Sequence, residues 1–475
     1  MKRFIQGENR SQSTLFPELL DDYINEENEI RVIDVFADSL DLSSLGFAGV
    51  IPKHTGRPSY HPSAMLKLYI YGYLNRVQTS RRLEKETHRN VELMWLMSRL
   101  TTDFKTIADF RKDNGNAIKN VCRNFIELCR QLDLFSDAVI AVDGSKFKAV
   151  NNKRRNYTKT SVKRRIEIAE KHVANYLSRL DELDEEANSN DSVSLDEKLM
   201  RIKKHLKTLK DIESKITSGE TSQVSLTDPN CRAMKSNSIG RTIDYNVQTA
   251  VDTKHHLIVG HYVTNAVVDR AELSKIAKEA QTVLKRKDIT VLADRGYYSA
   301  VEIKKVQDAG MTPIVPKTKT SGSKKRNMFT RDDFIYDKEK DVYICPNNRE
   351  IPYSFTSDER GKTMRGYVSI KVCKGCLIKG LCSTAKARRV KRWEHEDRLD
   401  KMESQLQSMP SAMNLRQSTV EHPYGTIKSR MGAAHFQTKT LKNVRAEMSL
   451  HVLTYNLTRM INIFGVKSLQ LAMQA

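Results

Sequence analysis

The sequence predicts an α/β protein, built on a mixed β-sheet with helices on both faces. Two short and largely apolar runs, VIAV at 139–142 and ITVLA at 289–293, each end in an aspartate. Uniformly apolar runs of this kind are typical of central strands that helices cover on both sides. Between them, residues 242–264 alternate with a period of two around a short turn, which predicts a β-hairpin.

Residues 1–135 are predicted to form a helical domain. Four short amphipathic segments follow one another there between polar turns: HPSAMLKLYIYGYLNR, SRRLEKETHR, NVELMWLMSR and KTIADFRKDN. Arg81 and Arg82 lie in the second segment, and helices of this kind could form a helix-turn-helix reader of DNA. A bundle that binds nothing is the alternative. Cys122 and Cys129 lie seven residues apart on one helical face, so we expect both in the core.

A pair of long helices is predicted after the first aspartate. Apolar residues alternate in steps of four and three over 162–183, and the same spacing returns over 195–209. The polar stretch ANSNDS separates the two, so the helices should fold back on each other as an antiparallel hairpin. We interpret the hairpin as an insertion that either grips a partner or serves as a structural arm. Further helices are predicted at 269–285 and at 440–464, the latter packed on the core.

The chain is strongly basic. Its 475 residues include 80 Lys and Arg against 58 Asp and Glu, a formal net charge of +22. Polyanions attract such a charge through counterion release, so nucleic acid is the expected partner. No apolar stretch approaches the roughly 20 residues of a membrane-spanning helix, and the opening MKRFIQGENRSQS lacks the apolar segment of a signal peptide. We therefore expect no membrane association and a cytoplasmic, reducing location.

The aspartates that end the two strands, Asp143 and Asp294, are candidate metal ligands. Ligands of such sheets gather beyond the carboxyl ends of the strands. If the strands are neighbours, the carboxylates repel each other unless a cation lies between them, and Mg²⁺ suits hard oxygen ligands. For a lone aspartate, the alternative is a turn former or a helix cap. Glu421 is the candidate third acid, and Pro423 is expected to place it at a helix start or a proline kink.

Basic residues accompany these acids. Lys428 lies seven residues after Glu421, and a helix that continued through the proline would return it to the face of the glutamate, where it could hold a substrate phosphate. Arg416 and Arg430 are candidates for the same role. Arg295, which directly follows the second aspartate, is a further candidate for DNA binding. For each of these residues, a solvated surface charge is the alternative.

Three motifs carry a resemblance to a known family. They are VDG around the first acid, ADRGY around the second and VEHPYGTIK around the third. With its order of strand, hairpin, helix, strand and late helix, most of the chain resembles the DDE transposases of bacterial insertion sequences. More narrowly, it resembles the insertion-sequence group eleven-eighty-two, which is related to the transposases of groups four and five.

The resemblance implies an RNase H-like core and a set of site residues. Asp143, Asp294 and Glu421 would be the metal-binding triad for Mg²⁺ or Mn²⁺, and Lys428 would be the basic residue that follows the glutamate. The related signature expects an arginine where this chain has Gln417, and its Arg416 stands one step further away.

The resemblance also implies a reaction and partners. Water would cut DNA at the ends of the element to leave a 3′-hydroxyl, which would attack target DNA in the same site without a covalent enzyme intermediate. The partners would be the terminal inverted repeats and the target DNA, bound by a homo-oligomer associated with the nucleoid. A catalytically silent repressor and a general Mg²⁺-dependent nuclease on the same fold are the alternatives. No nucleotide cofactor is expected, because the RGKT at 360–363 lacks the leading glycine of a phosphate-binding loop.

Four of the seven cysteines form a second candidate metal site. Cys345, Cys373, Cys376 and Cys382 have the spacing C-x27-C-x2-C-x5-C, which can supply a tetrahedral Zn²⁺ site. Thiols that stay free in a reducing location, or a redox pair, are the alternatives.

These patterns divide the chain into six segments. A helical domain and three parts of a catalytic core are separated by a helical-hairpin insertion and a cysteine-bearing β insertion. In chain order, they are the helical, DNA-binding domain (1–135), the first part of the core (136–155), the hairpin (156–235), the second part of the core (236–317), the cysteine-containing insertion (318–408) and the C-terminal part of the core with the glutamate helix (409–475).

Overall fold

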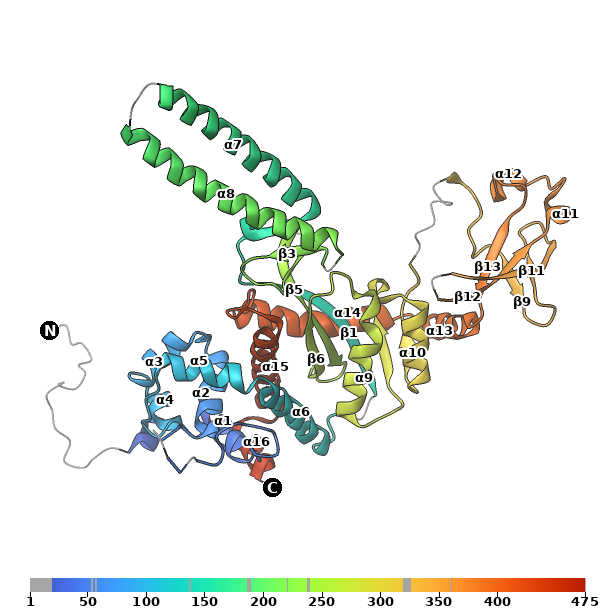
Figure 1. Cartoon of the computed structure of the whole chain (residues 1–475). Helices are drawn as coiled ribbons and strands as arrows, with labels where there is room; N and C mark the ends of the chain where they lie inside the picture. The colour runs from blue at the N-terminus through green and yellow to red at the C-terminus, as the bar shows by residue number, and fades with distance from the viewer. Residues whose placement is uncertain are drawn as a thin grey trace, which may run out of the picture.

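The computed structural model has a mixed β-sheet at its centre, from which a helical region, a helical hairpin and a second small sheet extend (Figure 1). It describes residues 19–52, 54–55, 58–135, 138–185, 189–219, 221–236, 240–318, 326–359 and 361–474. Segment 1–18, on which the expected location partly rests, lies outside the described residues, as does residue 360 of the RGKT stretch.

The central sheet combines parallel and antiparallel strands. β5 pairs antiparallel with β1 along one edge, and with β4 and β6 along the other. On the far side of β1, the strands β7 and β8 continue the sheet in parallel. These strands are β1 (Val139–Lys148), β4 (Arg232–Ser236), β5 (Gly240–Asp252), β6 (Ile258–Thr264), β7 (Thr290–Ala293) and β8 (Thr312–Ile314). The predicted mixed α/β class is confirmed.

Helices cover both faces of this sheet. On one face, Val142 of β1 belongs to a large core that also contains α9 (Leu273–Leu284) and α6 (Gly115–Gln131). On the other face, Phe147 packs in a second core with residues of α14 (Ala412–Gly425) and α15 (Leu441–Phe464). Because side chains alternate along a strand, Asp143 shares the α14 face with Phe147, whereas Gly144 faces α9.

The N-terminal helices and the C-terminal helices pack together. The N-terminal set comprises α1 (Ile30–Asp38), α2 (Pro62–Leu74), α3 (Ser80–Thr87), α4 (Val91–Leu96) and α5 (Phe104–Asp113), preceded by the short helix η1 (Leu20–Tyr23). α15 contacts α2, α5 and α6 as well as β6, and α16 (Val466–Gln474) packs against α1. Cys122 and Cys129 are buried in this shared core, as predicted.

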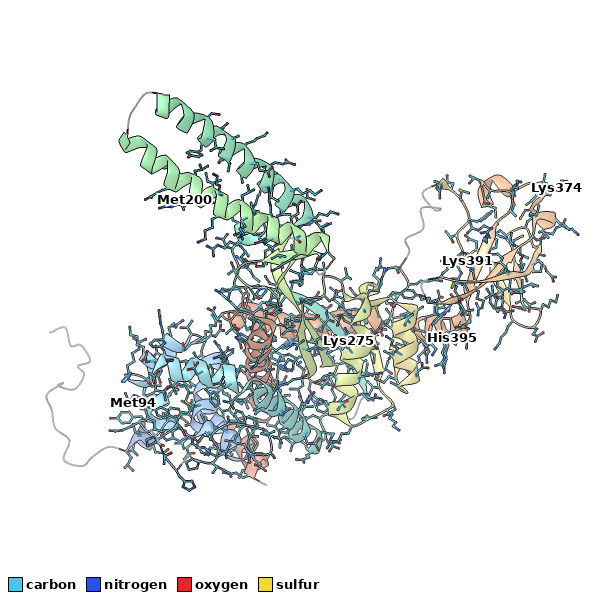
Figure 2. All side chains as sticks on the ribbon, viewed as in Figure 1. Met94, Met200, Lys275, Lys374, Lys391 and His395 are labelled. Carbon is cyan, nitrogen blue, oxygen red and sulfur yellow. The ribbon has the colours of Figure 1, made fainter. Side chains whose placement is uncertain are left out.

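The helical hairpin projects away from the central sheet (Figure 1). It consists of α7 (Lys159–Glu185) and α8 (Ser189–Thr217), and the short strands β2 (Asn156–Thr158) and β3 (Gln223–Ser225) pair at its base. Apolar side chains of the two helices form a separate small core, in agreement with the heptad spacing. Met200 of α8 is 72% exposed and stands on the outer surface of the hairpin (Figure 2).

The cysteine-bearing region forms a second, antiparallel sheet. Its strand order is β13-β12-β11-β10-β9, and the strands are β9 (Ile335–Asp337), β10 (Val342–Ile344), β11 (Glu350–Asp358), β12 (Thr363–Val368) and β13 (Arg389–Trp393). Two short helices, α11 (Ile370–Cys373) and α12 (Lys379–Cys382), connect β12 with β13. α13 (Glu396–Ser408) then returns the chain to α14, and it packs against α10 (Ala300–Asp308) and β8 of the central sheet.

In the part of the chain that the structure describes, we find no helix whose length and apolar character would allow it to cross a membrane.

Candidate active site

The two predicted aspartates follow neighbouring parallel strands. β1 and β7 are in register with Val142 beside Ala293, so Asp143 and Asp294 are the next residues on each strand. Leu292, two residues before Asp294, packs in one cluster with Ala412 of α14, which indicates that both aspartates lie on the α14 face. The charge of Asp294 also contributes to raising the pKa of Asp143. The prediction that the two strands are neighbours is therefore confirmed.

Asp143 is largely withdrawn from water. Burial is the main cause that raises the pKa of its carboxyl to about 6; Arg416 lowers it, and the negative charges of Asp294 and Asp269 raise it. Arg416 Nη2 lies 2.5 Å from Asp143 Oδ1, and the two side chains are 13% and 26% exposed. Arg416, predicted to hold a DNA phosphate, thus neutralises one of the candidate metal ligands in this structure.

Glu421 lies inside α14 and not at a helix start. α14 includes Pro423 and passes directly into a π-helical turn at Thr426–Arg430, so the irregularity falls after the glutamate. The Glu421 side chain is exposed and accepts a hydrogen bond of 2.8 Å from Gln417 Nε2. Among the described residues, no three carboxylate, imidazole or thiol side chains stand grouped as metal ligands. The structure brings the two aspartates together and places Glu421 on the helix that covers them.

Lys428 lies in this π-helical turn and contacts β1. Its ammonium group donates to Ser145 Oγ at 2.6 Å and to the carbonyl of Lys146 at 2.9 Å. Burial lowers the pKa of Lys428, whereas Asp244 and Asp143 raise it. Ser145 is two residues beyond Asp143, so this cation lies on the same face of the sheet as Asp143.

Tyr424 fixes α14 to the strand that carries Asp143. Its hydroxyl lies 2.8 Å from the carbonyl oxygen of Val247 and 3.0 Å from that of Asp143, and it accepts a hydrogen bond of 3.0 Å from Thr249 Oγ1. Burial is the main cause that raises the pKa of Tyr424 far above its usual value, so the phenol stays protonated. Nothing in the local sequence predicts this role beyond the presence of a tyrosine in the third motif.

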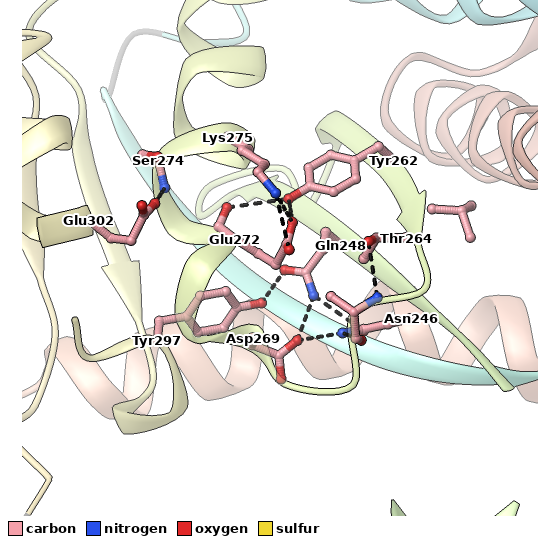
Figure 3. Close-up of polar contacts among 12 residues, drawn as sticks. Asn246, Gln248, Tyr262, Thr264, Asp269, Glu272, Ser274, Lys275, Tyr297 and Glu302 are labelled. Carbon is pink, nitrogen blue, oxygen red and sulfur yellow. Dashed lines mark hydrogen bonds and ion pairs between the residues drawn. The ribbon is translucent and has the colours of Figure 1, made fainter. Parts of the chain in front are cut away.

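A polar network of mostly buried side chains lies on the opposite face of the sheet (Figure 3). It packs against Gly144. The hydroxyl of Tyr297 donates to Gln248 Oε1 at 2.5 Å, and Gln248 Nε2 donates to Asp269 Oδ1 at 2.7 Å. Asn246 Nδ2 donates to the same oxygen at 2.7 Å. A β-carbon on Gly144 would stand 2.5 Å from Asp269 Oδ1, so glycine is the residue that this packing admits.

This network joins the two candidate metal ligands through the backbone. Gln248 is paired with Gly144 across β5 and β1, next to Asp143. Tyr297 lies three residues after Asp294, in the short helix Arg295–Tyr297 that Asp294 caps by accepting a hydrogen bond of 2.8 Å from the backbone N–H of Gly296. The network therefore ties the turn after one aspartate to the strand of the other. Sequence reasoning missed it because its members are distant in the chain.

Four arginines predicted to bind DNA lie at the surface. Arg81, Arg82, Arg295 and Arg430 are all exposed. The guanidinium of Arg81 lies over the ring of Phe104, 5.2 Å from its centroid. Contact of these side chains with DNA stays a prediction.

The four predicted zinc ligands face one small cavity in the second sheet. Cys345, Cys373, Cys376 and Cys382 all line it, and all four are free thiols. Burial is the largest cause that raises the pKa of Cys382, and each of the other three thiols raises it further.

Two regions of the chain match known domain families. Residues 18–113 match a transposase domain, DUF772. Residues 344–461 match a transposase DDE domain. Both family models describe transposase domains. The transposase DDE match contains Glu421 and Lys428, whereas Asp143 and Asp294 lie outside both matches. The two matches support a DDE transposase and leave the narrower insertion-sequence group untested.

One solved structure that resembles the chain is a piggyBac transposase synaptic complex with hairpin DNA. The match has a TM-score of 0.31 and 9% sequence identity, and it covers 94% of this chain and 79% of that chain. No curated protein sequence matches the chain.

Proposed function

We propose that this chain is the DNA transposase of a bacterial insertion sequence, of the group eleven-eighty-two that its motifs resemble. It would cut DNA at the ends of its element and join the resulting 3′-hydroxyl to target DNA. The two transposase domain matches support the enzyme class. The single observation that carries the site is the parallel register of β1 and β7, which brings Asp143 and Asp294 side by side beneath the helix of Glu421.

An RNase H-like core is part of this proposal. The strand order β6-β5-β1-β7-β8 has antiparallel pairs on one side of β1 and parallel pairs on the other. The acids follow β1 and β7 and lie on a late helix, which is the order that the family resemblance implies. We infer that the core is assembled from 136–155, 236–317 and 409–475, and that 1–135 is the DNA-binding domain.

The residues present fit a divalent metal ion. A largely buried carboxylate with a second carboxylate beside it needs a positive charge, and Arg416 supplies that charge in this structure. Asp143 and Asp294 would hold Mg²⁺ or Mn²⁺. Glu421 would complete the set of ligands after its hydrogen bond with Gln417 breaks. When bound, the metal supplies activation of water and stabilisation of the leaving oxygen in phosphoryl transfer.

Basic residues of the chain would hold the DNA backbone beside these acids. Lys428 is a partly buried cation on the face of Asp143, and Arg416 approaches the same carboxylate from α14. Both would place positive charge where a scissile phosphate enters, and such contacts fix the register of the DNA without reading its sequence. The exposed arginines at 81, 82, 295 and 430 would extend the contact, with a homo-oligomer holding two element ends.

Cleavage and joining of DNA test the proposal. The substrate is a duplex that carries the terminal inverted repeats of the element, supplied with Mg²⁺ and a target plasmid. Asp143→Asn, Asp294→Asn and Glu421→Gln should each abolish both cleavage and strand transfer. The exposed residues Asp397 and Glu403 of α13 provide matched controls, and Asp397→Asn and Glu403→Gln should leave both steps unchanged.

The products separate the alternatives. Cleavage without joined products would indicate a nuclease, and binding without cleavage would indicate a repressor. Full activity of Asp143→Asn or Asp294→Asn would refute the assignment of the site.

A further inference from the structure

The connection between β12 and β13 is an ordered segment without a core of its own. It contains α11 and α12, each of four residues, and none of the residues 368–389 is buried. Helices this short are not stable in water as isolated segments, because one turn makes too few hydrogen bonds to offset the free-energy cost of nucleation. Contacts with the neighbouring strands must therefore hold the segment in place.

The connection meets the sheet at a cavity that its cysteines line. Cys373, Cys376 and Cys382 of the connection face a cavity of about 20 Å³ together with Cys345, which directly follows β10. A space of this size admits about one water-sized body. Its other walls are largely apolar, with Phe329, Phe334, Ile351, Val372 and Ile378, and none of the described residues that line it is acidic.

Two tight turns present the thiols to the cavity. At the first, the N–H of Cys345 donates to the carbonyl of Arg349 at 2.9 Å, and Asn348 has a φ of 53°. At the second, Gly375 has a φ of 81° between Cys373 and Cys376, and the N–H of Lys379 donates to the carbonyl of Cys376 at 3.2 Å. Each turn contains one residue with a left-handed backbone, a conformation that glycine and asparagine adopt more readily than other residues. This residue allows the chain to fold back closely around its cysteine.

The sheet that carries this segment has a small core. Five buried side chains compose it: Phe334, Tyr343, Ile351, Tyr367 and Val390. Small units with so little buried apolar surface commonly depend on a disulfide or a structural metal. A disulfide between Cys373 and Cys376 would link residues that are already neighbours in the chain, so it would not fasten the connection to β10.

We propose that Cys345, Cys373, Cys376 and Cys382 bind one structural Zn²⁺, which fastens the connection between β12 and β13 to β10. Four thiolates form a soft, tetrahedral donor set that Zn²⁺ prefers. No three ligand side chains are already grouped in the described residues, so the thiols turn inward around the ion as it binds. Their four protons pass to the solvent.

Metal content tests this site directly. Protein produced with added zinc and dialysed against metal-free buffer is expected to retain one zinc ion per chain, measured by mass spectrometry of the elements. Cys373→Ser and Cys345→Ser should lose this zinc. Cys129→Ala, which removes a buried thiol from the helical core, is the matched control and should retain it. A zinc-free wild type, stoichiometric iron in its place, or zinc retained in both serine variants would overturn the proposal.

Two measurements on the wild-type chain need no variant. A chelator should increase the number of thiols that react with Ellman's reagent by four, and added zinc should reverse the increase. The same chelator should speed tryptic cleavage at Lys371 and Lys374, which are exposed in the connection; Lys374 lies near its outer end (Figure 2). Unchanged thiol reactivity and unchanged cleavage would count against the site. None of these measurements uses DNA, so their results test the zinc site independently of the proposed transposase activity.

Discussion

The guanidinium of Arg416 and the carboxylate of Asp143 form an ion pair of 2.5 Å on the face of the sheet that α14 covers. Arg416 is also within 3.4 Å of the carbonyl of Val142, so its side chain lies along the end of β1. The pair supplies, from within the chain, the positive charge that two adjacent aspartates require. A cation bound by the two aspartates would compete with this ion pair.

Replacement of Arg416 is expected to make the protein more dependent on divalent metal for its stability. Arg416→Gln leaves a largely buried carboxylate without its partner, which should cost about 1–3 kcal/mol in the free energy of unfolding without metal. Mn²⁺ should restore more stability to this variant than to the wild type, as measured by the metal-induced shift of the thermal midpoint. Arg201→Gln, at a side chain that is 80% exposed, is the control. An equal shift in wild type and Arg416→Gln would contradict the competition.

The raised pKa of Asp143 predicts a pH dependence of stability in the metal-free protein. The pKa of its carboxyl is about 6 in the folded chain against 3.8 for an unperturbed aspartate, so the folded state binds the proton more tightly. Its contribution is therefore fully present below about pH 4 and is lost as the pH rises through about 6.

A comparison with Asp143→Asn isolates this contribution. The difference in free energy of unfolding between wild type and variant should change by at most about 3 kcal/mol between pH 4 and pH 6, with the wild type relatively more stable at the acidic end. Urea denaturation at several pH values measures it. A difference that is independent of pH would show that Asp143 titrates normally.

Gly144→Ala should disrupt the site from behind. The added methyl would meet Gln248 Nε2 and Asp269 Oδ1, and both side chains are held by the network that reaches Tyr297. Overpacking of a buried site typically costs about 1–3 kcal/mol, and here the loss of a buried hydrogen bond adds to it. Gly425→Ala, in α14 with no atom within 4 Å of the added carbon, should be neutral or stabilising by up to about 1 kcal/mol. Chemical denaturation measures the free energy of unfolding of both variants. Equal stabilities of the two variants would contradict the prediction.

The base of the helical hairpin is expected to contact DNA. Residues 153–165 contain seven Lys and Arg and no acidic residue. Residues 198–210 contain six Lys and Arg and also lack an acidic residue. Lys163 and Arg164 are exposed on α7. Their joint replacement by glutamine should reduce the slope of log affinity against log salt by about 2, because two phosphate contacts are lost. Lys340→Gln, at an exposed residue of the second sheet, should leave the slope unchanged. Identical slopes for all three proteins would make the hairpin a structural arm.

Much of the framework could be predicted from local sequence patterns. The apolar runs before Asp143 and Asp294 indicated buried strands, and the structure pairs them directly. The helix expected at 440–464 is α15, Leu441–Phe464. Patterns of this kind depend on neighbours in the chain, where the periodicity of a strand or a helix is visible.

The contacts that complete the site were not predictable in the same way. Arg416 reaches Asp143 across 273 residues of chain, and Tyr297 reaches Gln248 across 49. The sequence predicts Glu421 at a helix start or a proline kink; the structure places it inside α14, which continues through Pro423 into a π-helical turn. A proline in the sequence shows only that one backbone hydrogen bond is missing, not how the following turn compensates for it.

The packing of α15 has a consequence for how the protein would measure distance along DNA. This helix has 24 residues, about 36 Å in length, and it touches both the N-terminal helices and the central sheet. α16 packs against α1, so the first and last α-helices of the described chain belong to the same packed unit. A duplex held by the N-terminal helices would therefore meet the aspartates at a spacing set by the packing of α15 against both regions.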